Sequence, residues 1–156
     1  MVGPAPTTAT QLLAHLNAAA TSTPYAIAVL ENRFGRVEFT IELDLKSERW
    51  RSSYEECGLD RTFRIRVRVI EPGQRLETSV QLSSLSRQPD PLTGRQLLVA
   101  ADPIGPRPYE PFGSNGRILE FGEKSDRTHS FTAIEAVGWL RRESEMRGFT
   151  PRSPRQ

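Results

Sequence analysis

The stretch that most constrains this chain runs from Thr62 to Ile70, where apolar and charged residues alternate without interruption. The apolar positions are Phe63, Ile65, Val67 and Val69, and the positions between them are Arg64, Arg66 and Arg68. Because successive side chains of a β-strand point to opposite faces of its sheet, this pattern predicts a half-buried strand. One face of that strand closes a core, and the other presents three guanidinium groups, which we call the Arg stripe.

The segments around this strand also read as strands. Residues 25–31 are apolar at nearly every position, and residues 36–46 and 75–83 alternate as regularly as the Arg-striped strand. The inward positions of the two alternating segments are Val37, Phe39, Ile41, Leu43, Leu45, Leu76, Thr78, Val80 and Leu82. Turn-forming residues separate the strands at Asn32–Gly35 and at Glu71–Gln74. Residues 25–83 are therefore expected to form an antiparallel meander with one buried face.

Helices are predicted at both ends of the chain. Thr8 with Gln11, and Thr132 with Glu135, have the spacing of capping boxes, which predicts helices to about residue 20 and over about 130–146. Two short strands are predicted at 96–101 and 117–121, and residues 47–61 read as a connection with room for one helical turn. A sheet with one apolar face needs a cover, and two amphipathic helices provide it. The expected fold is therefore an α+β layer, with a half-open barrel as the alternative.

A chain of 156 residues suits a single domain. We predict a flexible N-terminus at 1–6, one α+β domain at 7–149 and a disordered basic tail at 150–156. Residues 1–30 contain no charged side chain, so they lack the basic residues of a secretory or mitochondrial targeting signal. No apolar run has the length of a membrane span, and Cys57 is the only cysteine. These features predict an intracellular protein without a membrane partner.

Catalytic chemistry has little support in the sequence. A nucleophilic group of Cys57, His129 and Asp126 is conceivable, but nothing in the spacing of these residues requires it. The chain lacks the His and Cys clusters of metal sites and the glycine-rich loops that cradle phosphates. We therefore expect neither a catalytic residue, nor a metal, nor a cofactor.

The last predicted helix carries a second face that suggests a binding surface. Trp139, Arg142 and Met146 follow one another at helical spacing, opposite the inward stripe, and Trp and Arg dominate protein–protein hot spots. In the alternative interpretation, the Pro-rich residues 103–116 fold over Trp139 and bury it. From this face we predict a non-catalytic binding domain whose partner is another protein, including a second copy of itself.

Two other functions remain open. All but two of the 21 basic residues are arginine, and the Arg stripe, with Arg152 and Arg155 of the tail, offers a surface for nucleic-acid phosphates. The same arginines also fit a structural charge ladder, because the neighbouring predicted strands carry the carboxylates Glu38, Glu42, Asp44 and Glu77. The remaining possibility is a small-molecule carrier, with a pocket between helices and sheet that residues 103–116 cover.

Overall fold

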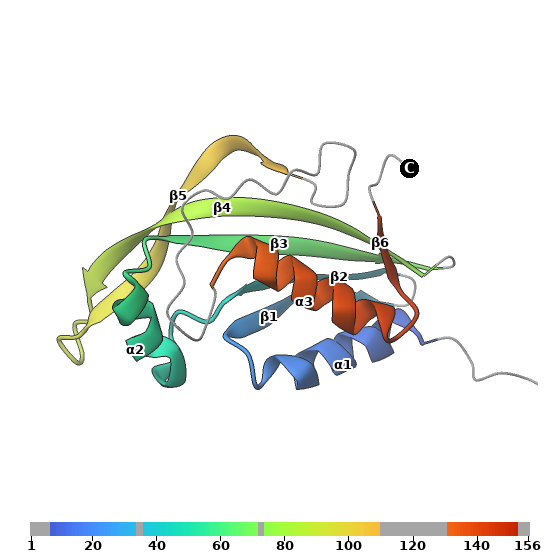
Figure 1. Cartoon of the computed structure of the whole chain (residues 1–156), viewed down its shortest axis with the longest axis horizontal. Helices are drawn as coiled ribbons and strands as arrows, with labels where there is room; N and C mark the ends of the chain where they lie inside the picture. Colours follow the sequence, from blue (N-terminus) through green and yellow to red (C-terminus); the bar gives the residue numbers. More distant parts are fainter. Residues whose placement is uncertain (1–6, 34–35, 72–73, 110–130, 153–156) are drawn as a thin grey trace, which may run out of the picture.

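The computed structural model describes residues 7–33, 36–71, 74–109 and 131–152 (Figure 1). In chain order its elements are α1 (Ala9–Ala20), β1 (Tyr25–Arg33), β2 (Arg36–Leu43), α2 (Glu48–Cys57), β3 (Arg61–Ile70), β4 (Arg75–Pro89), β5 (Gln96–Tyr109), α3 (Ala133–Glu145) and β6 (Thr150–Arg152). The predicted α+β class and the order of its meander are confirmed. The predicted strand at 117–121 lies outside the described residues.

The strands of the described residues form one sheet in the order β1-β2-β3-β4-β5, with neighbours antiparallel. β6 pairs in parallel with the start of β4, at Arg75, Leu76 and Glu77. The order leaves β1 and β5 at the two borders, so these strands make an open sheet rather than a closed barrel. α1 and α3 lie side by side on one face, with α1 next to β1 (Figure 1). We call the opposite face the outer face.

The core lies between the helices and the sheet, where the sequence alternation places it. The inward side chains of β2, β3 and β4 are buried, and they meet the apolar stripes of α1 and α3. The fully buried residues among them include Leu12, Leu16, Phe39, Ile41, Ile65, Val67, Leu76 and Leu140. The space in which a carrier was expected to hold its small molecule is therefore occupied by core side chains.

Both predicted caps are present. Thr8 accepts a hydrogen bond from the backbone of Gln11 while the Gln11 side chain accepts from the backbone N–H of Thr8, which completes a capping box. Thr132 caps α3 by accepting from the backbone N–H of Glu135. These bonds satisfy N–H groups that have no partner inside the helix, so each one fixes where its helix begins.

Helix α2 replaces the expected connection at 47–61. Its sequence is mostly polar, but Trp50 and Tyr54 are four residues apart and therefore share one face. Both are buried, and the rings of Trp50 and Tyr54 meet Phe131 edge-on at centroid distances of 6.1 and 4.9 Å. Gly58 ends the helix with φ 65°, in the left-handed region that glycine adopts without strain. The single predicted turn was too short because tertiary burial of two aromatic rings holds this helix together.

A polar contact ties the two covering helices to each other. His15 of α1 lies with Nε2 2.7 Å from Oε2 of Glu143 on α3, and its Nδ1 lies 3.1 Å from a guanidinium nitrogen of Arg147. The arginine can only donate, so Nδ1 accepts and Nε2–H donates to the carboxylate. The half-buried imidazole thus fixes α1 against the C-terminal end of α3.

Among the described residues, no helix combines the length and the apolar content needed to cross a membrane.

Candidate functional site

The Arg stripe lies on the outer face, as predicted, and each of its guanidinium groups lies beside a carboxylate of a neighbouring strand. Arg64 is hydrogen-bonded to Glu42, and the Nε atom of Arg66 donates to Oε1 of Glu38 at 2.6 Å. Arg68 lies 3.8 Å from a carboxylate oxygen of Glu77 on β4.

The bond of Arg66 runs diagonally, since Thr40 and Ser79 are the residues directly opposite it on β2 and β4. The hydrogen bond and the negative charge of Glu38 raise the pKa of Arg66. Asp44, which was expected to flank the stripe, instead has its carboxylate in the turn after β2, where it accepts a hydrogen bond from the backbone N–H of Lys46. The geometry is that of a charge ladder across three strands.

We expect this ladder to contribute little to stability. In a double-mutant cycle of Arg66→Gln and Glu38→Gln, the coupling free energy should be about 0.2–1 kcal/mol, because exposed pairs gain little in water. Unfolding in urea measures it. The cycle of Arg66→Gln with Glu77→Gln is the matched control, and its coupling should be near zero because these two side chains are not bonded. Equal coupling in the two cycles would contradict a specific Arg66–Glu38 bond.

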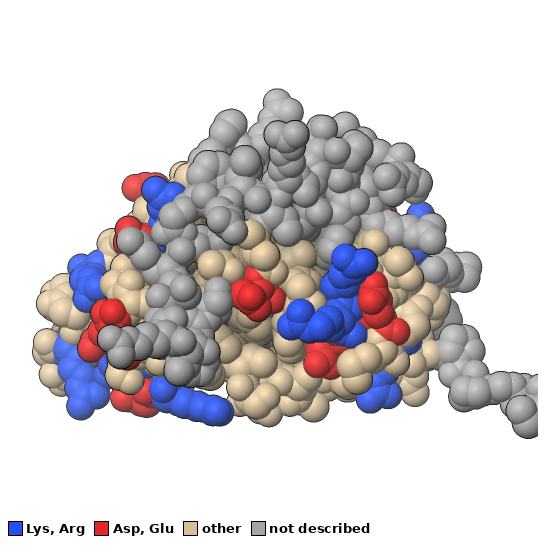
Figure 2. All heavy atoms as spheres, in the orientation of Figure 1, with Lys and Arg blue, Asp and Glu red and all other residues tan. Residues whose placement is uncertain are grey.

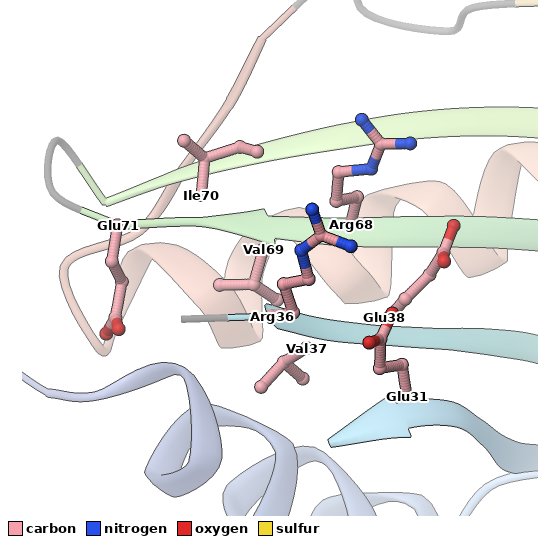
Figure 3. A pocket seen from close by; sticks show the side chains of 8 residues that line it. All are labelled: Glu31, Arg36, Val37, Glu38, Arg68, Val69, Ile70 and Glu71. Carbon is pink, nitrogen blue, oxygen red and sulfur yellow. The ribbon is translucent and has the colours of Figure 1, made fainter. Parts of the chain in front are cut away.

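Two grooves open on the outer face. One, of about 440 Å³, is lined by residues of β2, β3, β4 and β5, which include Arg64, Arg66, Gln81, Ala100 and Pro103. The other, of about 420 Å³, lies at the end of the sheet near the β1–β2 and β3–β4 turns. There the guanidinium groups of Arg36 and Arg68 lie near one another, with Glu31 and Glu38 beside them (Figure 3). Both grooves mix the two signs of charge, so neither attracts one class of ion strongly.

The structure buries Trp139, the main residue of the partner surface predicted on α3. Trp139 is only 8% exposed, and its ring packs against Tyr25 of β1 with centroids 5.2 Å apart. Arg142 is exposed and Met146 is 72% exposed, so the three side chains do not form one surface. The physical reason is that β1 extends the sheet beneath α3, which turns the supposed outer side of Trp139 toward the core. The alternative cover for Trp139, residues 103–116, lies partly outside the described residues, so it stays a prediction.

The predicted disordered tail begins with ordered chain. Residues 150–152 pair with β4 as β6, and Thr150 donates its backbone N–H to the C=O of Gln74 at 2.9 Å. Arg152 lies in this strand beside Glu77, and Arg155 lies outside the described residues. A nucleic-acid surface built from the stripe and the tail therefore stays a prediction, which the salt dependence of oligonucleotide binding tests.

β1 presents a feature that the sequence interpretation missed, which is an open sheet edge. Asp44 donates its backbone N–H to the C=O of Pro24 at 2.7 Å, so Pro24 faces β2. Hydrogen-bonded pairs recur at every second residue of an antiparallel ladder. The backbone N–H and C=O groups of Tyr25, Ile27 and Val29 therefore point away from β2. We call this side of β1 the free edge.

A second bond supports this orientation independently. Leu85 of β4 donates its backbone N–H to the C=O of Asp60, so residues of even number on β3 face β4. Ile65 then faces β2, and its partner Ile41 faces β3 rather than β1. Ile27 pairs with Ile41 by register, so its own backbone groups point to the free edge. Within the described ranges, no strand pairs with this edge.

The side chains along the free edge are uncharged and partly exposed. Val29 is 49% exposed and Leu30 is 53% exposed, which makes them unusual among the large apolar residues described. Leu30 has no partner in the register, because the ladder shifts between Val29 and Glu31 at a β-bulge. Burial raises the pKa of the Tyr25 phenol above its usual range, and the nearby Glu135 carboxylate adds to that effect.

Helix α1 extends this uncharged surface beside the strand. Its sequence contains no Lys, Arg, Asp or Glu, and its exposed residues are Thr10, Gln11, Ala14, Asn17 and Ala18. Figure 2 shows a largely uncharged surface over the C-terminal half of α1, with charged side chains gathered toward α3. The sequence signal for this surface was the absence of charge in residues 1–30 together with the apolar character of both faces of β1.

Of the three residues considered for catalysis, the structure describes Cys57 alone. The Cys57 thiol is half-buried and lies 3.4 Å from the C=O of Tyr54, while His129 and Asp126 fall outside the described ranges. In those ranges, no group of three or more His, Cys, Asp and Glu side chains is placed to hold a metal ion.

Comparisons with protein-family models, with curated proteins and with solved structures found no match to this chain.

Proposed function

We propose that this chain is a non-catalytic protein-binding domain, and that it binds through the free edge of β1 together with the uncharged surface of α1. The observation that carries the proposal is the row of outward-facing backbone groups at Tyr25, Ile27 and Val29. An open edge of this kind binds an extended segment by adding it to the sheet as a further strand.

Before its bulge at Leu30, the free edge lacks the Pro and charged residues that protect many natural edge strands. Edge strands are commonly blocked by Lys, by Pro or by charges that point inward, which prevents unwanted pairing. Between Tyr25 and Leu30 the strand has none of these, and its charged residues begin at Glu31, beyond the bulge. An unprotected and partly apolar edge of this kind fits a strand that pairs with a partner segment when the protein functions.

The charged features of the outer face support binding less well. The guanidinium groups of Arg64, Arg66 and Arg68 already lie beside carboxylates, and a ligand would have to displace or share these contacts. For that reason we place the binding surface on β1 and α1, and we assign the Arg stripe a structural role.

A photo-crosslinking side chain at position 30 tests the proposal. We expect it to form covalent protein adducts in extracts of the source cells or in the purified protein, because Leu30 lies exposed at the bulge of β1. The matched control is position 92, where Leu92 is 93% exposed in the β4–β5 turn, far from the free edge in sequence. Adducts are read by gel mobility and mass spectrometry.

A second substitution shows whether the adducts depend on the edge. Val29→Pro removes a backbone N–H that faces outward, so it weakens strand addition without taking a bond from β2. We expect adducts at position 30 to be lost in this variant, while Val29→Thr keeps them. Equal adducts from positions 30 and 92, or none from position 30 under any condition, would overturn the proposed function.

A further inference from the structure

We propose that the partner at the free edge is a second copy of this chain, paired through antiparallel β1 strands about a two-fold axis at Ile27. This inference rests on the proposed function, because it names the occupant of the same edge. Closed dimers with a two-fold axis use the same surface on both copies, so the surface must be complementary to itself. The β1 strand meets this condition in its side chains, its backbone and its charges.

The side-chain pattern of β1 reads the same in both directions. Tyr25-Ala26-Ile27-Ala28-Val29 alternates large and small residues symmetrically about Ile27. In an antiparallel pair centred there, Tyr25 lies opposite Val29 of the second copy, Ile27 opposite Ile27, and Ala26 opposite Ala28. Aromatic with β-branched pairs are among the favourable cross-strand contacts.

The backbone selects the same register. The groups that face the free edge belong to Tyr25, Ile27 and Val29, so two copies can pair only in registers that set odd residues against odd residues. Centring on Ile27 matches all three with each other. Shifting the axis to Ala28 sets Tyr25 against Glu31 beyond the bulge, and shifting it to Ala26 leaves Val29 opposite Thr23.

The bonds of that register can be counted from the donors that are available. Ile27 and Val29 each donate one N–H per copy, to Ile27 and Tyr25 of the other copy. The N–H of Tyr25 already donates to the hydroxyl of Thr23 at 3.2 Å, so it is not required. Pro24, which has no N–H, faces β2 and therefore removes nothing from the new ladder.

Charges also permit this pairing. Residues 21–30 carry none, and in the Ile27-centred register the first charged residues, Glu31 and Arg33, fall opposite Thr23 and Thr21 of the other copy. No like charges meet across the axis. The adjacent helix α1 carries no acidic or basic side chain apart from His15, whose two ring nitrogens already contact Glu143 and Arg147. The two copies thus approach without electrostatic repulsion at strand or helix.

Sedimentation velocity of the purified chain over a range of concentrations tests the dimer directly. We expect a reversible dimer that Val29→Pro weakens by about 30-fold, because two backbone hydrogen bonds, one per copy, are lost. Val29→Thr is the matched control, since it keeps the N–H and nearly the same shape, and its dimer should match that of the wild type. A wild-type chain that stays monomeric at every concentration would overturn the inference.

Disulfide trapping tests the register and does not depend on the proline variant folding. In a Cys57→Ser background, Ala26→Cys and Ala28→Cys are made separately. Opposite residues of a non-hydrogen-bonded pair have Cα atoms about 4.5 Å apart, which lies within the range that a disulfide spans. We expect a crosslinked dimer when the two variants are mixed under mild oxidation. Crosslinking as efficient in either variant alone would contradict the Ile27-centred register.

The crosslinking tests of the proposed function and the tests of the dimer have independent outcomes. A purified chain that is monomeric, together with edge-dependent adducts to a different protein at position 30, would leave the proposed function standing and overturn the second copy as its partner. Absence of both the dimer and the adducts would remove both proposals.

Discussion

Replacing Trp139 by alanine is expected to lower the free energy of unfolding by about 3–5 kcal/mol, the usual cost of deleting a large buried aromatic ring. Trp139 is buried on α3, and its ring packs against Tyr25. Removing the indole leaves a cavity between the helix and β1 and deletes an aromatic contact. Chemical denaturation followed by circular dichroism measures the loss.

Met146 provides the matched control because it follows the end of the same helix and is 72% exposed. We expect Met146→Ala to change the free energy of unfolding by less than about 0.5 kcal/mol, as surface substitutions usually do. If the Trp139 variant were as stable as the Met146 variant, the indole would have to lie in solvent. That result would support the partner surface on α3 that was first inferred from the sequence.

Replacing Ile65 by arginine is expected to prevent cooperative folding. Ile65 is fully buried at the centre of β3, with Ile41 and Val80 as its neighbours on the adjoining strands. An arginine there would bury a charge without a carboxylate beside it, at a cost of several kcal/mol, comparable to the whole stability of a small domain. Loss of the unfolding transition and of dispersed amide signals in a proton NMR spectrum would report it.

The neighbouring residue supplies the control for that experiment. Arg66→Ile places an apolar side chain on the outer face of the same strand, where it removes one exposed ion pair. We expect it to change the free energy of unfolding by less than about 1 kcal/mol. Similar losses in both variants would mean that the two faces of β3 are not divided into core and solvent as described.

Much of the architecture could be predicted because it depends on local spacing. The alternation in β2 and β3 defines which side chains face the core, since a strand repeats every two residues. The capping residues Thr8 and Thr132 marked where α1 and α3 begin, because a side-chain oxygen bonds the first free N–H groups. Sequential strands pair as neighbours, across short turns at β1–β2 and β3–β4 and across α2 at β2–β3.

Other features were misjudged because they depend on contacts between distant segments. α2 is a helix of ten residues because Trp50 and Tyr54 pack against Phe131, which lies far along the chain. No local sequence pattern reveals that contact. β6 is ordered because the start of β4 offers it backbone partners. β4 and β5 are likewise longer than expected, as each supplies the other with a ladder beyond the regular alternation.

The sequence by itself determined the alternating strands, the helix starts and the placement of the Arg stripe on one face, because each of these follows from the period of an extended or helical backbone. Only the tertiary structure decided that Trp139 is buried, that Arg66 bonds Glu38 rather than a directly opposite residue, and that β1 is one of the two border strands. The physical reason is that burial, ion pairing and edge position depend on which surfaces meet across the fold. Residues 25–29, apolar on both faces, form an open sheet edge only because no described strand lies beyond them.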